Sequence, residues 1–150
     1  MAADRDRDPE VMRVGGRGVI LDSNFLFVPL RFGVDIFGEL ERLLGPSVVC
    51  LVPAAALAEL GVLRDGASPS LLREIDFAVE LAERCRILEG DRLEGESVDD
   101  LILRLAVGGG YLVATNDGEL RRRLRGEGVA VVFLRQRAFL EVEGYVEGLG

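Results

Sequence analysis

Short apolar runs alternate along this chain with amphipathic segments, and this alternation restricts the fold more than any other feature. The run at 48–52, VVCLV, is continuous and rich in β-branched residues, which is typical of a parallel strand buried on both faces. The other predicted strands lie at 19–21, 85–88, 111–115 and 129–134, with a further edge-strand candidate at 139–143. Such an alternation predicts a series of β–α–β units.

The segments between these runs have the features of helices. Apolar residues recur with a helical period in 34–44, and Ser68 and Ser97 precede two other segments in the position of N-caps. The predicted helices span 34–44, 54–63, 71–84, 97–107 and 116–125. We therefore expect a flexible N-terminal segment at 1–17 and a single domain at 18–150. The domain is of the α/β class, with three layers, α/β/α, around a central, mostly parallel sheet.

The composition excludes several kinds of catalysis. The sequence contains no His, and its 18 basic residues are all Arg. This excludes His-based acid–base chemistry, Ser–His or Cys–His triads, a Lys-containing P-loop and a Schiff-base lysine. The two cysteines, Cys50 and Cys85, are a poor ligand set for zinc, and we expect them to be buried free thiols. An enzyme of this composition has to use carboxylates, hydroxyls, Arg or hard metal ions.

The charge and hydropathy patterns bear on the partners of the protein. A net charge of −8 argues against broad electrostatic binding to nucleic acid, although a local basic strip is compatible with it. No apolar run approaches the roughly 18 to 20 residues that a membrane span needs. The opening stretch, MAADRDRDPE, lacks the apolar segment of a secretory signal. We therefore expect a cytoplasmic protein with no membrane attachment.

Acidic residues fall near the carboxyl ends of several predicted strands. They are Asp22 after the first strand, Glu59 on the helix after the second, Asp99 and Asp100 at the start of a later helix, and Asp117 after the strand at 111–115. Because the carboxyl ends of parallel strands meet at one edge of a sheet, these side chains are expected to converge there. Clustered carboxylates repel one another, and a bound divalent cation relieves the repulsion. Ligands that are all hard oxygens select Mg²⁺ or Mn²⁺.

Each of these acids also has a purely structural explanation. Asp22 could form an Asx-turn or cap a helix, and Glu59 could face solvent. Asp100 resembles the partner of Ser97 in a capping box, and Asp117 stands where a helix N-cap would stand. What favours a functional site is the shared location of all these acids at one sheet edge.

The order and context of the acids resemble the PIN-domain nuclease family. The matching motifs are the D-S-N of Asp22-Ser23-Asn24, the E-L of Glu59-Leu60, the Asp99 of SVDDLIL and the T-N-D of Thr115-Asn116-Asp117. The resemblance covers roughly residues 18–136. Within the family, the chain looks most like the branch that processes ribosomal RNA in archaea and eukaryotes, and less like the toxins of bacterial toxin–antitoxin pairs.

The resemblance implies an endoribonuclease that hydrolyses RNA phosphodiester bonds with Mg²⁺ or Mn²⁺, in RNA processing or in toxin-like cleavage. The implied catalytic and metal-binding residues are Asp22, Glu59, Asp99 and Asp117, with Asp100 as a further metal ligand. The implied supporting residues are Ser23, Asn24, Thr115 and Asn116. The implied partners are RNA, a second copy of the chain, and a ribosome-assembly or antitoxin protein.

The densest basic patch is the sequence RRRLR at 121–125. On a helix, Arg121 and Arg125 share a face and Arg122 lies beside it. These three residues are candidates for contact with RNA phosphates. A solvated surface balanced by nearby Glu residues is an equally good explanation.

Two other classes of function are compatible with part of the pattern. A non-catalytic PIN-like scaffold that binds RNA or protein would share the fold. A phosphotransfer domain of the receiver or haloacid-dehalogenase kind also has an Asp after its first strand. That class relies on a Lys, which is absent from this chain.

Overall fold

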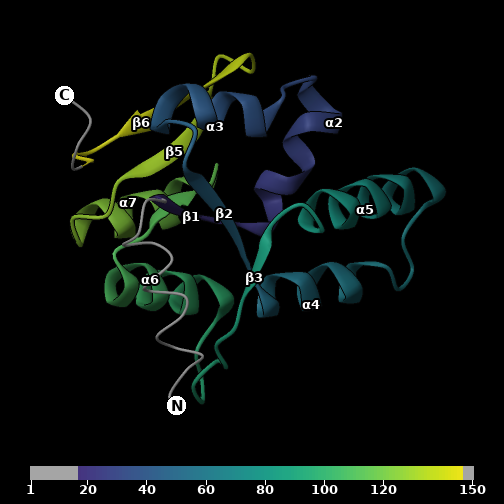
Figure 1. Cartoon of the computed structure of the whole chain (residues 1–150). Helices are drawn as coiled ribbons and strands as arrows, with labels where there is room; N and C mark the ends of the chain where they lie inside the picture. The colour runs from purple at the N-terminus through teal and green to yellow at the C-terminus, as the bar shows by residue number, and fades with distance from the viewer. Residues whose placement is uncertain (1–16, 147–150) are drawn as a thin grey trace.

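A computed structural model of the chain describes residues 17–146 as a six-stranded sheet covered by helices on both faces (Figure 1). The strands are β1 (Arg17–Leu21), β2 (Val48–Pro53), β3 (Arg86–Leu88), β4 (Leu112–Ala114), β5 (Val131–Arg135) and β6 (Phe139–Glu143). The helices are the 3₁₀-helix η1 (Ser23–Phe27) and the α-helices α2 (Val28–Phe32), α3 (Ile36–Leu44), α4 (Ala54–Leu63), α5 (Pro69–Ala82), α6 (Val98–Gly109) and α7 (Gly118–Gly126).

The strand order in the sheet is β3-β2-β1-β4-β5-β6. The first five strands pair in parallel, and β6 pairs with β5 in antiparallel orientation. From β1 the chain first builds outward through β2 and β3, then returns to the other side of β1 with β4. The order therefore reverses between β1 and β4. In open α/β sheets, ligands bind outside the carboxyl ends of the strands at such a point.

Alternate residues of β1 face the two helical layers, and this alternation divides the core. Val19 and Leu21 belong to one buried cluster, and Ile20 belongs to the other. The first cluster includes Phe25 of η1, Leu40 of α3, Leu60 of α4 and Ile75 of α5. The second includes Ile102 of α6 and Leu120 of α7. The three-layer α/β/α class predicted from the sequence is thus confirmed, as is the edge strand at 139–143.

The structure contains two short helices, η1 and α2, that the hydrophobic pattern did not predict. Phe25, Leu26, Phe27 and Val28 are all buried, so this stretch has no polar face and no helical period to detect. Asp22 is the N-cap residue of η1, and its side chain accepts a hydrogen bond from the backbone N–H of Ser23, the first residue of this helix.

The remaining differences lie at element boundaries and at the termini. The helix predicted at 116–125 begins at Gly118, because Asp117 is its N-cap rather than part of it. Of the predicted N-terminal segment, residues 1–16 lie outside the described part of the chain, and Arg17 is already the first residue of β1. Cys50 and Cys85 are free thiols and are half-buried. Between residues 17 and 146, no helix is both long enough and apolar enough to cross a membrane.

Candidate active site

Asp22 lies directly beyond the carboxyl end of β1, at the point where the strand order reverses. Its backbone N–H donates to the Ala114 carbonyl of β4 over 3.0 Å. Its Oδ1 accepts from the Ser23 backbone N–H (2.8 Å), and its Oδ2 accepts from Thr115 Oγ1 (2.7 Å) and Asn24 Nδ2 (3.2 Å). All of these donors are neutral, and the residue is only 4% exposed. The fold therefore holds a buried carboxylate in one orientation, and no positive side chain of residues 17–146 pairs with it.

The surroundings of Asp22 disfavour its charged form. Burial raises the pKa of Asp22 to about 6, against the lowering effect of the hydrogen bonds from Thr115 and Ser23. Repulsion from Asp99 and Glu59 contributes a part of this rise. A buried acid that lies close to other acids is one of the arrangements in which a carboxylate gains most from a bound cation.

Glu59 reaches the same edge from α4. This helix follows β2 directly, so a residue in its second turn lies beside the carboxyl ends of β2 and β1. Glu59 is exposed, and its Oε1 accepts a hydrogen bond from Ser23 Oγ over 3.2 Å. Ser23 thus connects the turn that holds Asp22 to the carboxylate on α4.

The segment after β4 connects Asp22 to Asp117. The buried Thr115 hydroxyl donates to Asp22 and accepts from the Asp117 backbone N–H over 3.1 Å. Asp117 Oδ1 caps α7 by accepting from the backbone N–H groups of Glu119 (2.9 Å) and Leu120 (3.0 Å). Capping uses only one of the two carboxylate oxygens. The structural explanation for Asp117 is therefore correct, and it leaves Oδ2 available to a ligand.

The adjacent acids of α6 have different surroundings. Asp100 forms a capping box with Ser97, and its other oxygen accepts from Arg123 over 2.7 Å. Asp99 accepts no hydrogen bond from the described residues. Partial burial raises the pKa of Asp99, and repulsion from Asp117 raises it further. Asp99 thus belongs electrostatically with the acids of the sheet edge, whereas both oxygens of Asp100 are already used.

Four acids from separate segments therefore influence one another at this edge. Asp22 interacts with Glu59 and with Asp99, and Asp99 interacts with Asp117. In the region 17–146, no three acidic or cysteine side chains converge closely enough to form a ready-made coordination sphere. The four carboxylates supply hard oxygen atoms only, the donors that Mg²⁺ and Mn²⁺ prefer. The chemistry of this donor set fits a divalent cation.

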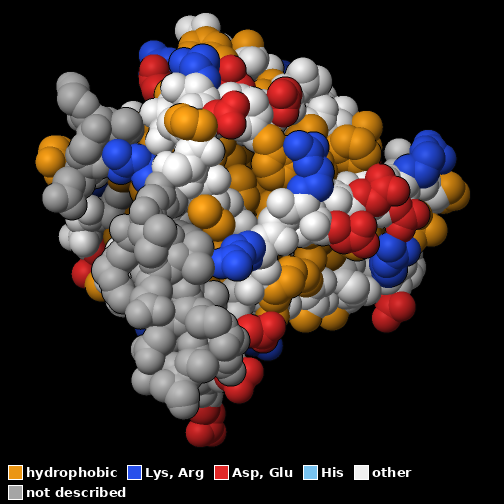
Figure 2. Space-filling model, viewed as in Figure 1, with side chains coloured by type: hydrophobic (Ala, Val, Ile, Leu, Met, Phe, Trp, Pro, Cys, Tyr) orange, Lys and Arg blue, Asp and Glu red, His pale blue; other side chains and the backbone are white. Residues whose placement is uncertain are grey.

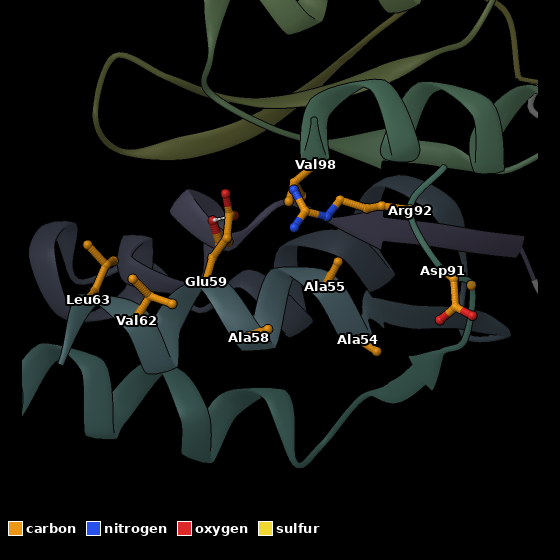
Figure 3. Close-up of a pocket in the computed structure, with 11 residues that line it drawn as sticks. Ala54, Ala55, Ala58, Glu59, Val62, Leu63, Asp91, Arg92 and Val98 are labelled. Carbon is orange, nitrogen blue, oxygen red and sulfur yellow. Dashed lines mark hydrogen bonds between the residues drawn. The ribbon is translucent and has the colours of Figure 1, made fainter. Parts of the chain in front are cut away.

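Two clefts are bordered by the residues that follow Asp22. The larger, about 660 Å³, includes Ser23 and Glu59 in its lining, together with residues of α4 and of the 89–96 loop (Figure 3). The smaller, about 280 Å³, is lined by Asn24, Asn116 and Asp117, together with residues of η1 and α2. Ser23 and Asn24, which follow Asp22 directly, thus border different clefts.

Asn116 has a structural contact that its position in the T-N-D motif does not reveal. Its Oδ1 accepts a hydrogen bond from the Leu134 backbone N–H over 2.9 Å. This bond ties the segment after β4 to the carboxyl end of β5. Asn116 thereby fixes the start of the turn that presents Asp117.

The predicted RNA-binding arginines differ in their availability. Arg121 pairs with Glu143 over 2.8 Å and lies 3.7 Å from the centroid of the Phe133 ring. Arg125 donates to the Val129 carbonyl over 3.1 Å. Arg122 is exposed and forms no ion pair within the described chain. A further Arg, Arg92, lines the larger cleft, but an isolated Arg in a polar loop gives no signal in the sequence.

Comparisons with known proteins identify the family and agree with the fold. Residues 19–137 match a family described as a PIN like domain. Ribonuclease VapC9 of Archaeoglobus fulgidus is 30% identical over 144 residues, which cover 95% of this chain and 98% of that protein.

The solved structure of the PIN domain endonuclease Utp24 is 28% identical and superposes with a TM-score of 0.71, covering 89% of this chain and 96% of that one. A domain of a functionally unknown protein from Methanocaldococcus jannaschii shares the fold, with a TM-score of 0.60 at 16% identity over 87% of this chain and 96% of that one. The chain therefore belongs to the PIN-domain nuclease family.

Proposed function

We propose that this protein is an endoribonuclease that hydrolyses RNA phosphodiester bonds and depends on Mg²⁺ or Mn²⁺. The observation that carries the proposal is the buried Asp22 carboxylate, which neighbouring acids repel and which no positive side chain of the described residues neutralises. The names of two relatives, a ribonuclease and a PIN domain endonuclease, support nuclease chemistry. The two free thiols suit a reducing compartment, so we propose a cytoplasmic enzyme.

Asp22, Glu59, Asp99 and Asp117 would hold the cation. Of these acids, Asp99 has no hydrogen bond within the described residues, and Asp117 has one oxygen that capping does not use. We assign Asp100 a supporting role, because its oxygens are engaged by Ser97 and Arg123. When bound, a divalent cation lowers the pKa of a coordinated water and balances the charge that develops on the phosphoryl oxygens.

The other residues of the site position these carboxylates. Thr115 and the Ser23 backbone fix the rotamer of Asp22, and the Ser23 hydroxyl orients Glu59. Thr115 also fixes the start of α7 through the Asp117 N–H. With their orientations set before substrate binds, the carboxylates need little reorganisation during the reaction. The exposed Arg122 of α7 is available to contact a phosphate of the RNA.

A cleavage assay tests this function. Purified protein should cut a fluorescently labelled RNA in Mn²⁺ or Mg²⁺, and excess EDTA should stop the reaction. Asp22→Asn should reduce the rate by at least about 100-fold, the scale on which loss of a group that stabilises transition-state charge is felt. The matched control is Asp65→Asn, because Asp65 is exposed and its side chain forms no ion pair with the described residues. Unchanged cleavage by Asp22→Asn, or cleavage in EDTA, would refute the proposal.

The alternative function is that of a non-catalytic scaffold. Such a protein would bind RNA or a protein partner through the same fold. A wild-type protein that binds RNA but leaves it intact in Mg²⁺ and in Mn²⁺ would support this alternative.

A further inference from the structure

The larger cleft has chemically different walls. One wall is α4, which presents Ala54, Ala55, Ala58, Val62 and Leu63, and the opposite side is formed by the 89–96 loop and Val98 of α6 (Figure 3). Its volume of about 660 Å³ lies within the range of roughly 300 to 1,000 Å³ that is usual for ligand sites. Ser23 and Glu59 belong to the same lining, so the cleft opens directly onto the acidic edge.

The α4 wall is aliphatic and exposed. Val62 is 73% exposed and Leu63 is 46% exposed, and hydrophobic side chains gather over α4 on the face shown in Figure 2. The three alanines have short side chains, so an extended chain can approach the helix closely. Such a surface can pack against the faces of ribose and base, whereas it offers no hydrogen-bonding groups to read a base edge. The α4 wall therefore suits a ligand that is bound independently of the ligand's base sequence.

Arg92 is the cation of this cleft. In Figure 3 its side chain extends from the loop over the cleft, in the direction of Glu59, while the Asp91 carboxylate points away from it. Its one hydrogen bond within the described chain is a long one, from Nη1 to the Glu96 carbonyl at 3.5 Å. No carboxylate of residues 17–146 pairs with it. The guanidinium is therefore available to an anion that enters the cleft.

The loop that carries Arg92 is fixed to α6. Arg104 donates to both carboxylate oxygens of Glu96, over 2.8 and 2.9 Å, and to the Asp91 carbonyl over 3.0 Å. The Leu93 backbone N–H also donates to Glu96 over 2.8 Å. The backbone on both sides of Arg92 is thus held to the helix that carries Asp99. Arg92 is consequently placed at a defined position relative to the acidic edge.

We propose that the cleft between α4 and the 89–96 loop binds the segment of single-stranded RNA next to the bond that is cleaved. Arg92 contacts a phosphate of this segment, and the aliphatic wall of α4 packs against its riboses and bases. The inference rests on the proposed nuclease function, which it deepens by assigning the path of the substrate. It also explains how an acidic protein can hold RNA. The face in Figure 2 shows acidic and basic side chains intermixed rather than one broad basic patch, so an individual Arg beside the cleft, such as Arg92, is the contact that this face offers.

The test measures binding separately from cleavage. The affinity of the full-length protein for a labelled single-stranded oligoribonucleotide is measured by fluorescence anisotropy in EDTA, at several salt concentrations. Arg92→Ala should weaken binding by about three- to tenfold at low salt and reduce the slope of log affinity against log salt by about 0.7, the value for one phosphate contact on a single strand. Arg92→Lys should retain most of the slope. In Mn²⁺, Arg92→Ala should raise KM more than it lowers kcat.

Two further variants complete the experiment. Arg86→Ala is the matched control, because Arg86 is exposed, begins β3 and lines neither cleft. The Arg86→Ala variant should bind RNA with the affinity of the wild type. Val62→Glu should weaken RNA binding by adding a negative charge to the α4 wall. Because Val62 is exposed, this substitution should not disturb folding. If Arg92→Ala binds RNA with the same affinity and salt slope as Arg86→Ala, the cleft proposal is wrong.

The outcomes separate this inference from the nuclease proposal. A protein that cleaves RNA through Asp22, but binds it independently of Arg92, refutes the cleft and retains the nuclease. A protein whose RNA binding depends on Arg92, but which never cleaves, refutes the nuclease and retains the cleft.

Discussion

At the scale of single residues, Asp22 determines what the site can do. Its carboxylate is buried and oriented by a hydroxyl, an amide and a backbone N–H. A side chain that served only as a turn or cap would have no need to be placed near Asp99 and Glu59, because their repulsion opposes its ionisation. Ionisation of Asp22 at neutral pH therefore lowers the free energy of unfolding, and this free energy should depend measurably on pH.

In EDTA, the free energy of unfolding should depend on pH through Asp22. The folded pKa of about 6 lies above the value of 3.8 expected in the unfolded chain, so the folded state binds the proton more tightly. The stabilisation from Asp22 is complete below about pH 4 and is lost as the pH rises through 6. Between pH 4 and pH 7, wild type should therefore lose roughly 2 kcal/mol relative to Asp22→Asn. Urea denaturation of both proteins at several pH values measures this difference. A difference that does not change with pH would show that Asp22 ionises normally.

Thr115 should be required both for stability and for cleavage. Thr115→Val keeps the shape of the side chain but removes a buried hydroxyl that donates to Asp22 and accepts from the Asp117 N–H. Buried polar groups left without a partner should lower the free energy of unfolding at pH 7 by about 1 to 3 kcal/mol. Cleavage should also fall, because the carboxylate loses its orientation. Thr115→Ser, which restores the hydroxyl, should recover both properties; a Val variant with wild-type activity would contradict the role given to Thr115.

At the scale of elements, helix capping and the candidate site use the same side chains. Asp117 caps α7 with one oxygen, whereas Asp100 uses one oxygen in the capping box of α6 and the other to pair with Arg123. Capping by itself engages one oxygen in each residue, and it is the ion pair with Arg123 that engages the second oxygen of Asp100. The helix N-termini place these acids at the sheet edge, and capping fixes the rotamers with which they meet a ligand.

Substitutions of Asp117 should separate its two roles. Asn is as good an N-cap as Asp, so Asp117→Asn should keep nearly the stability of the wild type, whereas Asp117→Ala should lose about 1 kcal/mol. Cleavage should be lost in both variants, because neither retains the carboxylate charge. Asp100→Asn is the comparison, since it keeps much of the cap and should retain most of the activity. Thermal unfolding and RNA cleavage, measured on all three, check this pattern; full activity in Asp117→Asn would remove Asp117 from the site.

The sequence predicted the elements that have a continuous apolar run, a helical period or a Ser N-cap. It missed the two short helices after Asp22. The parallel strands and the helices α3 to α7 follow from apolar runs and from caps such as Ser68 and Ser97. The two helices after Asp22 could not be predicted in this way, because Phe25–Val28 is buried on every side. The basic patch was only partly informative, since Arg121 and Arg125 make contacts with residues far along the chain or in the next loop. Such contacts depend on tertiary packing, which periodicity does not encode.

At the scale of the whole molecule, the sheet topology brings the site together. Asp22 follows β1 and Thr115 follows β4, and these neighbouring strands flank the reversal of strand order. Glu59 comes from the helical layer on one face of the sheet, and Asp99 comes from the layer on the other. The acids are far apart in sequence and come within electrostatic range of one another only in the folded chain. A cation that binds them should stabilise the fold as a whole.

Mn²⁺ should accordingly raise the melting temperature of the protein. At a Mn²⁺ concentration of 100 times Kd, binding to the native state alone adds about 2.7 kcal/mol to the free energy of unfolding, which corresponds to a shift of several degrees for a chain of this size. EDTA should reverse the shift. Asp22→Asn should show little shift, and Asp65→Asn should behave as the wild type. A similar shift in wild type and Asp22→Asn would mean that Mn²⁺ binds elsewhere.

The most direct test of the four-acid site is a crystal structure of the protein with Mn²⁺, with data collected to reveal the anomalous signal of the metal. We predict an anomalous peak at coordinating distance from Asp22 and at least one of Asp99 and Asp117, with Glu59 coordinating the metal directly or through water. The peak should be absent in crystals of Asp22→Asn grown in the same conditions. An anomalous peak remote from Asp22, or none at all in crystals of a protein that cleaves RNA in Mn²⁺, would contradict the account.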